Sequence, residues 1–203
     1  MSSNFLELAF AMRMIDGWGW CGTTASEVGL VCTTLGHTRE SASMSELQRA
    51  SSASRSGPRG SDRLRRRRTE HTQWPAAGRT AYHIAGHALE ELWEYLTSGR
   101  QRLDVALDQR ASTTFQHSVW EQMRHIPFGE TRSYAWLARS IGRPHATQAV
   151  GRAVSSSPNL IFIPCHRVVA ARGIGGYSRG TKLKQRLLDH EQAWPRMLAM
   201  PGT

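Results

Sequence analysis

A stretch of Ser, Arg, Gly and Pro from residue 48 to residue 72 holds almost no large apolar side chain and divides the apolar parts of this 203-residue chain. Such a segment cannot offset its loss of conformational entropy by burying apolar surface, so it is predicted to be a flexible loop. The chain is long enough for one or two compact domains. We expect two, residues 1–110 with the loop inside and residues 111–192, followed by a tail at 193–203.

Positive charge is concentrated in the second expected domain. The formal net charge is +10; residues 111–192 hold 11 Lys and Arg against 4 Asp and Glu, whereas residues 1–110 hold 14 against 12. Such a basic excess favours a polyanionic partner. In the first domain most of the positive charge lies in the segment Arg49–Arg68. The rest of this domain has a net negative charge and is expected to bind nucleic acid poorly. The run Arg65–Arg68 is more typical of a solvated surface than of a recognition element, although contact with phosphate stays open.

Apolar runs and cysteines indicate the compartment. No apolar run approaches the ~20 residues of a membrane span, and Phe5–Met14 lacks the basic lead and cleavage site of a signal peptide. Three cysteines are too few, and odd in number, for a disulfide framework. We expect a soluble monomer in the reducing cytoplasm, associated with the nucleoid if bacterial, with no membrane contact. Cys21 and Cys32 lack a paired histidine at finger-like spacing, so no metal site is expected.

The first domain is expected to hold a small β-sheet and a helix. Two β-favouring runs, residues 18–24 and 28–35, predict a hairpin that turns at Ser26-Glu27. Apolar side chains at helical spacing predict a helix over Thr80–Thr97, capped by its first residue. Alternation of apolar and other residues over 103–107 predicts a further short strand.

The second domain is expected to be mainly helical. One helix is predicted to start at residue 112 or 113 and to end before the breaker segment Ile126–Gly129. A short helix follows over Ser133–Gly142, and a second begins with Pro144 in its first turn and runs to about Val154. Two helices joined by a Gly-containing turn form a helix-turn-helix. The predicted fold class is therefore α+β, with a small N-terminal β-sheet/helix domain followed by a helical domain with a winged-helix-like helix-turn-helix.

The second helix of this pair carries mostly small side chains, and only Gln148 and Arg152 are long. Small side chains suit a shallow contact with a groove better than readout of base edges. We therefore expect DNA binding with little sequence preference. A transcriptional regulator that uses the helix-turn-helix alone, with Cys165 as a methyl-sensing switch, is an alternative, but it would need base-reading side chains.

The segment Pro164–Arg167 follows a buried apolar run and contains the third cysteine. A thiol of ordinary pKa is mostly protonated at neutral pH, so a cysteine nucleophile needs a base or positive surroundings. His166 and Arg167 are the candidates. Because adjacent side chains diverge, His166 is expected to reach the sulfur of Cys165 through a water, with Glu191 as the acceptor that orients its ring. On the Cys-His pair alone, a buried, inert thiol is the commoner interpretation.

Four ordered segments resemble the O6-alkylguanine-DNA alkyltransferases, and the resemblance is dense over residues 115–191 and looser over 17–107. They are Ile126–Tyr134, Ala149–Gly151, Pro164–Val169 and Gly176–Ser178. The resemblance implies repair of O6-alkylguanine, and of O4-alkylthymine, in double-stranded DNA by irreversible, single-turnover transfer of the alkyl group to a cysteine. It also implies binding in the minor groove and flipping of the damaged base. The resemblance implies a stoichiometric methylated-DNA–protein-cysteine S-methyltransferase that needs no cofactor.

The resemblance also assigns roles to residues. Cys165 is the acceptor, His166 its water-relayed base, Glu191 the residue that orients His166, and Tyr134 helps to rotate the nucleotide. Hydrogen bonds to the departing guanine neutralise it. The implied base-binding residues are Ser178, Tyr177, Val168 and Lys184. The implied DNA-binding residues are Tyr134, Ala146, Thr147, Gln148, Gly151, Arg152 and Ser155.

Three positions depart from the family's pattern. Gln148 stands where the family usually has an arginine that fills the gap left by the flipped base. Ser157 replaces an asparagine that links the recognition helix to the active-site strand, and a serine is expected to make one turn-stabilising hydrogen bond there. Arg179 replaces a glycine and is expected to narrow the pocket against large adducts. A non-catalytic sensor of alkylated bases is the other alternative, although such proteins lack the acceptor cysteine that this chain keeps.

Overall fold

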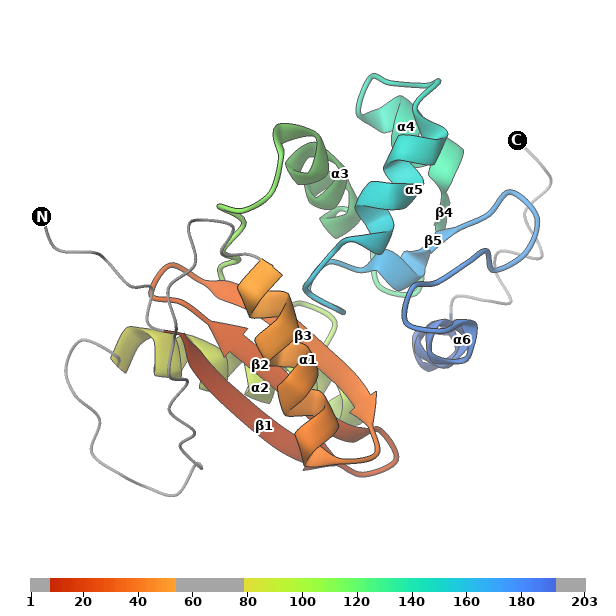
Figure 1. The fold of residues 1–203 in the computed structure, drawn as a ribbon. Coiled ribbons are helices and arrows are strands. Elements are labelled where there is room, and N and C mark those ends of the chain that lie inside the picture. The colour runs from red at the N-terminus through yellow and green to blue at the C-terminus, as the bar shows by residue number, and fades with distance from the viewer. Residues whose placement is uncertain (1–7, 54–78, 193–203) are drawn as a thin grey trace, which may run out of the picture. The chain divides into compact units, whose positions relative to one another are not determined.

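The computed structural model describes residues 8–53 and 79–192 and divides the chain into two compact units, Met1–Ala111 and Ser112–Thr203 (Figure 1). The expected domain boundary at residues 110 and 111 lies within one residue of this division. The expected tail lies outside the described residues. None of the helices in the described ranges is long and apolar enough to cross a membrane.

The first unit is built on a three-stranded antiparallel sheet in the order β1-β2-β3. The hairpin prediction is confirmed, because β2 (Gly19–Ala25) pairs with β3 (Leu30–His37). Strand β1 (Ala9–Ile15) was not predicted, and it pairs along its whole length with β2. Its burial does not alternate cleanly, since two successive residues near its end are exposed, and so it lacks the period-two pattern of a strand.

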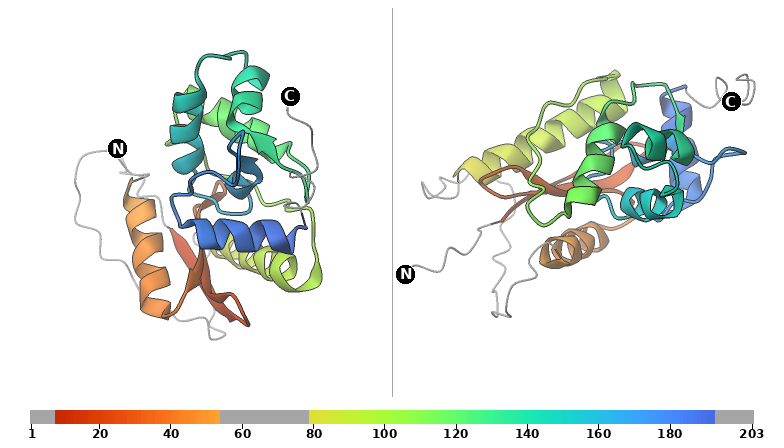
Figure 2. Two further views of the ribbon diagram at one scale, coloured as in Figure 1. Left: turned by 90° about the vertical axis from the view of Figure 1, so that its right-hand side faces the viewer. Right: turned by 90° about the horizontal axis from the view of Figure 1, so that it is seen from above.

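Two helices cover the two faces of this sheet (Figure 2). Helix α2 (Arg79–Ser98) confirms the predicted helix, but it starts before Thr80, which therefore lies in its first turn and is not its cap. Helix α1 (Glu40–Ala53) shows that the loop prediction was wrong for residues 48–53. The rest of the predicted loop lies outside the described residues.

Close packing explains why α1 forms despite its serine-rich sequence. Leu47 is fully buried, and a Cβ on Gly22 of the sheet would lie only 2.8 Å from its Cδ1. The hydroxyl groups of Ser43 and Thr34 lie 2.7 Å apart across the interface, and Ser51 donates to the carbonyl of Leu47 at 2.6 Å. Short side chains thus let the helix approach the sheet closely, and burial outweighs its modest helix propensity.

The strand predicted over residues 103–107 does not form, and only an isolated bridge joins Leu107 to Leu30. Leu30 N donates to the carbonyl of Ala106 at 2.8 Å, but nearby the backbone N–H of Asp104 donates to the carboxylate of Glu91. A backbone donor that bonds to a side chain is not available to extend a ladder. The prediction was therefore wrong about this element.

The second unit begins with two helices whose starts confirm the predicted caps. Helix α3 (Thr114–Arg124) has a capping box in which Thr113 and Gln116 satisfy one another's backbone N–H groups. Helix α4 (Tyr134–Ser140) is capped by Ser133, whose hydroxyl accepts from Trp136 N at 3.0 Å.

The helix-turn-helix is completed by α5 (Thr147–Ser155), after a turn in which Gly142 has a φ of +70°. Pro144 does not lie in the first turn of α5, as predicted, because it sits in a separate turn closed by Ala146 N and the carbonyl of Arg143 at 2.9 Å. The indole of Trp120 on α3 donates to the carbonyl of Ala153 at 2.7 Å, which fixes α5 against α3.

Three short elements follow α5. The 3-10 helix η2 (Cys165–Arg167) leads into β5 (Val168–Val169), which pairs in parallel with β4 (Arg132–Ser133), and α6 (Thr181–His190) closes the unit. The segment before η2 is a turn and not a strand, and Ile161 there has a φ of 72°, which is rare for a β-branched residue.

Helix α1 should carry part of the stability of the first unit. Leu47→Ala removes a fully buried side chain and should cost roughly 2–5 kcal/mol, because the close-packed sheet cannot collapse into the space. Urea unfolding of the full chain measures the effect. Ser45→Ala, on the exposed side of the same helix, is the control and should change stability by less than about 0.5 kcal/mol. Equal, small effects of both changes would contradict a packed α1.

Candidate active site

Parallel pairing of β4 with β5 brings the two ends of the candidate site together. Arg132 lies opposite Val168, and Ser133 lies opposite Val169. Tyr134, the first residue of α4, therefore starts beside the segment that carries Cys165. The segments that carry Tyr134 and Cys165, 31 positions apart in the sequence, are thus brought together. The cap at Ser133 fixes the start of α4, and the pairing of β4 with β5 holds the two segments side by side.

Glu191, the C-cap residue of α6, is the centre of a buried hydrogen-bond network. Its carboxylate lies 2.8 Å from His166 Nε2 and accepts from the guanidinium of Arg167 at 2.9 Å. It also accepts from the backbone N–H of Gly129 at 3.1 Å. The expected pairing of Glu191 with His166 is thus present in the structure. Because the carboxylate contacts Nε2, the second ring nitrogen, Nδ1, is the one that does not face Glu191.

Burial alone would raise the pKa of Glu191, but the hydrogen bonds with His166 and Arg167 and the positive charge of Arg167 outweigh it and hold that pKa well below its usual range. A carboxyl group whose pKa is lower in the folded protein stabilises the fold. The stabilisation is complete at a pH above the pKa of the unfolded chain, about 4.3, and it is lost as the pH falls toward the pKa of the folded protein. Burial lowers the pKa of His166, so its imidazole is neutral at neutral pH and can accept a proton.

Cys165 is almost fully buried, with 4% of its surface exposed. Burial raises the pKa of its thiol, opposed by the hydroxyl of Tyr177, which lies 3.2 Å from the sulfur, and by the positive charge of Lys184. The thiol is therefore protonated at rest. Arg167 was expected to be a source of positive charge at the sulfur, but its guanidinium is taken up by Glu191 and the carbonyl of Ile126.

Lys184 is a buried cation behind two aromatic rings. Its Nζ donates to the carbonyl of Val168 at 2.6 Å and lies 5.9 Å from the ring centre of Tyr134 and 5.6 Å from that of Tyr177. Burial lowers its pKa to about 8. The carbonyl of Val168, an expected acceptor for guanine, already takes one hydrogen bond and retains a second lone pair.

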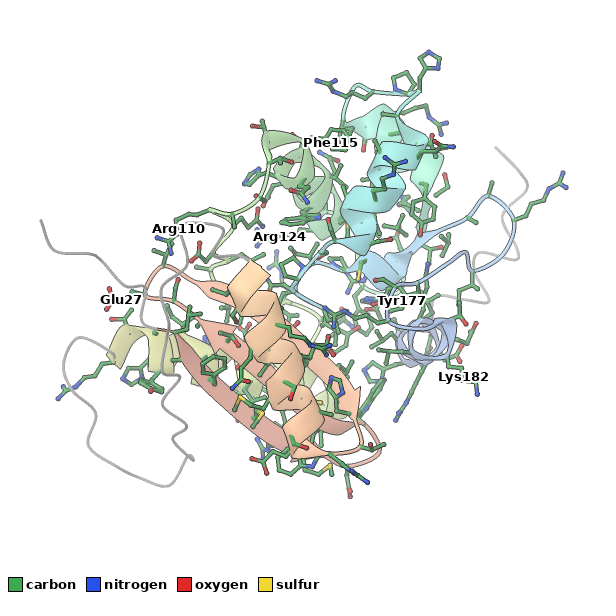
Figure 3. All side chains as sticks on the ribbon, in the orientation of Figure 1. Glu27, Arg110, Phe115, Arg124, Tyr177 and Lys182 are labelled. Atoms are coloured by element: carbon green, nitrogen blue, oxygen red, sulfur yellow. The ribbon has the colours of Figure 1, made fainter. Side chains whose placement is uncertain are left out.

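An open pocket of about 780 Å³ lies along α5, next to Tyr177, which Figure 3 shows on the segment leading into α6. The expected site residues in its wall are Tyr134, Gln148, Gly151, Arg152, Ser155 and Tyr177; Ser156 and Gly176 were not expected. Tyr177 therefore lines the pocket and also contacts the sulfur of Cys165.

The remaining expected residues lie outside the pocket wall. Cys165, His166 and Val168 are buried and do not line it, and Ser178 donates to the carbonyl of Ser155 at 3.2 Å. Ala146 is the N-cap residue of α5, and Thr147 is the first residue of this helix. Sequence reasoning missed the structural role of Arg167 at Glu191, for which the only sequence signal is its place two residues after the cysteine.

Comparison with known proteins agrees with this geometry. The family model for the DNA-binding domain of 6-O-methylguanine DNA methyltransferase matches residues 114–193. A methylated-DNA–protein-cysteine methyltransferase of Methanosarcina acetivorans is 42% identical over 105 residues, which are 51% of this chain and 67% of the relative. The crystal structure of Mycobacterium tuberculosis OGT in complex with DNA is 30% identical, with a TM-score of 0.61 and 92% of each chain covered. The chain belongs to the methylated-DNA–protein-cysteine methyltransferase family.

A third relative shows the extent of the match. The methylated-DNA–protein-cysteine methyltransferase of Mycolicibacterium paratuberculosis is 44% identical over 106 residues, and the match spans 52% of this chain and 64% of the relative. The family model matches the second unit only, whereas the M. tuberculosis structure in complex with DNA covers 92% of the chain.

Two departures from the family's pattern have structural outcomes. The hydroxyl of Ser157 is buried and has no hydrogen-bond partner among the described residues, so the expected turn-stabilising bond is not made. The backbone N–H of Ser157 closes the turn instead, by donating to the carbonyl of Val154 at 3.3 Å. Arg179 is not part of the pocket wall, so the structure does not support its expected role in narrowing the pocket.

Loss of the Glu191 carboxylate should destabilise the second unit strongly. Glu191→Gln leaves Arg167 buried without its counter-ion, which should cost roughly 3–5 kcal/mol at neutral pH. Urea unfolding measures this loss. The matched control is Glu130→Gln, which breaks a partly exposed pair with Arg132 and should cost no more than about 1 kcal/mol. A similar, small loss in both variants would contradict the central role of Glu191.

Proposed function

We propose that this protein repairs O6-alkylguanine in double-stranded DNA, and O4-alkylthymine as a further substrate, by irreversible transfer of the alkyl group to Cys165. The observation that carries the proposal is the pair His166–Glu191 next to Cys165, with Tyr177 joining the sulfur to the pocket along α5. Membership of the family and the DNA complex of its M. tuberculosis member support the choice of substrate.

The chemistry follows from the protonation states. The resting thiol of Cys165 gives its proton, through a water, to the neutral imidazole of His166 as its sulfur attacks the alkyl carbon. The carbon–oxygen bond breaks, and its electrons leave with the guanine. The guanine takes up one proton from solvent and the imidazolium of His166 returns one to solvent, so that thiol and alkylguanine become thioether and guanine without a net change of charge. Glu191 stabilises the imidazolium that exists during transfer.

The pocket residues bind and position the base in this proposal. Tyr134 helps to rotate the nucleotide out of the stack, and Ser178 with the backbone after Tyr177 donates toward the guanine oxygen. These donors stabilise the charge that develops on the leaving group. The carbonyl groups of Cys165 and Val168 accept from the exocyclic amine. No cofactor takes part, because the sulfur itself retains the alkyl group.

Helix α5 provides the DNA contact, and its surface is open. A Cβ built on Gly151 would have no atom within 4 Å, so the protein's own packing does not require glycine there. The small residue instead leaves room for a ligand, which suits insertion of α5 into the minor groove of DNA. Ala146, Thr147, Gln148 and Ser155 complete the proposed contact surface.

We further propose that the protein acts as a monomer in the cytoplasm, at the nucleoid if the source is bacterial. Support comes from its three cysteines, all of which are free, as a reducing compartment would keep them. A reduced Cys165 is a requirement of the transfer reaction.

Alkyl transfer is tested by mass spectrometry of the intact protein after incubation with a duplex that carries one O6-methylguanine. The protein should gain the mass of one methylene group, and Cys165→Ala should gain nothing. Binding of the duplex by both proteins without a gain in mass would favour a non-catalytic sensor and overturn the proposed reaction.

Gly151→Ala should separate stability from function. Alanine in the helix interior should raise stability by roughly 0.5–1 kcal/mol, because it meets no neighbour and loses less backbone entropy. The added methyl group should nevertheless weaken duplex binding, as measured by fluorescence anisotropy. Unchanged affinity with raised stability would show that α5 does not approach DNA at this point.

A further inference from the structure

Among the residues that the structure describes, Arg152 is the only charged side chain in the wall of the pocket along α5. It is exposed, and its guanidinium makes no hydrogen bond or ion pair with any described residue. In contrast, Arg132 and Arg167 of the same unit are paired with the carboxylates of Glu130 and Glu191. No carboxylate of residues 8–53 or 79–192 lines the pocket, so within these ranges the charge of Arg152 is not compensated there.

The position of Arg152 on α5 places this charge beside the proposed base-binding residues. Gln148, Arg152 and Ser155 are four and three residues apart, which puts them on one face of the helix. The same pocket is lined by Tyr134 and by Tyr177, whose hydroxyl contacts the sulfur of Cys165. A ligand with an anionic group near α5 and a planar group near the two tyrosines would complement this pocket.

We infer that Arg152 binds a phosphodiester that flanks the extruded nucleotide and so holds the nucleotide in its rotated position. The inference rests on the proposed function, because it takes DNA as the ligand. A guanidinium can hold two phosphate oxygens in its planar fork, which fixes orientation as well as supplying charge. Gln148, one turn earlier, is neutral and cannot do this. Arg152 is accordingly a positioning residue, and the sulfur chemistry is left to Cys165 and His166.

The test combines protein variants with DNA in which one phosphate is replaced by a neutral methylphosphonate. Duplexes carry O6-methylguanine with the replacement on its 5′ side, on its 3′ side, or several nucleotides away. Single-turnover transfer is measured for the wild-type protein, for Arg152→Gln and for Arg139→Gln. Arg139 is the matched control, because it is an exposed arginine of α4 that also makes no ion pair among the described residues.

At one of the two flanking phosphates, neutralisation should slow the wild-type protein by roughly 10-fold or more, the size of a charge-assisted hydrogen bond. It should slow Arg139→Gln equally, and it should have little further effect on Arg152→Gln. The slope of duplex affinity against salt concentration, both on logarithmic scales, should also be shallower in Arg152→Gln, by the equivalent of about one phosphate contact. Arg152→Lys should recover part of the loss, because it restores the charge without the fork. The double variant Gln148→Arg/Arg152→Gln moves the positive charge by one turn of α5. Transfer by this variant should then be slowed by neutralisation of a different phosphate.

Additive effects of Arg152→Gln and of each flanking methylphosphonate would overturn the inference, as would equal coupling in Arg139→Gln. The same double-mutant cycle is measured for duplex binding in a Cys165→Ser background, which needs no alkyl transfer. Coupling in binding without transfer by the wild-type protein would overturn the proposed function alone. Transfer with additive effects would overturn only the role of Arg152.

Discussion

The buried carboxylate of Glu191 is the interaction on which the candidate site depends. It joins three parts of the second unit, since its partners are His166 and Arg167 on η2 and the backbone N–H of Gly129 before β4. Its own position is the C-cap of α6. A single charged group thus fixes the end of α6, the segment that carries Cys165 and the entry to the helix-turn-helix. Because the carboxylate is buried, each of these partners is needed to offset its desolvation.

Local chemistry made the starts of α3 and α4 predictable. Thr113 and Ser133 cap α3 and α4 through their own hydroxyl groups, and a capping residue acts on the next three residues of the chain, whatever the fold. The pairing of His166 with Glu191 was also expected, but only through resemblance to a family. The distance of 25 residues between them gives no local signal of contact.

The elements that were missed owe their form to packing between distant segments. Helix α1 has a serine-rich sequence, and it folds because Leu47 fills the space that Gly22 leaves in the sheet. The predicted strand near Asp104 fails because Glu91 takes its backbone donor. The buried hydroxyl of Ser157 was also not predictable, because no feature of the sequence reveals that it has no hydrogen-bond partner in the part of the chain that the structure describes. For α1 and for the predicted strand, the deciding partner lies elsewhere in the chain.

In the proposed function, burial of Cys165 suits a protein that can react only once. A thiolate exposed to solvent would be alkylated or oxidised by small electrophiles, and each such event would consume a molecule. Cys165 avoids this by being 4% exposed, with a thiol whose pKa burial raises. Its reactivity then depends on His166 taking the proton and on Tyr177 yielding its contact with the sulfur. In the proposed function both conditions are met when a base fills the pocket, so the fold that protects the thiol also restricts its reaction to DNA.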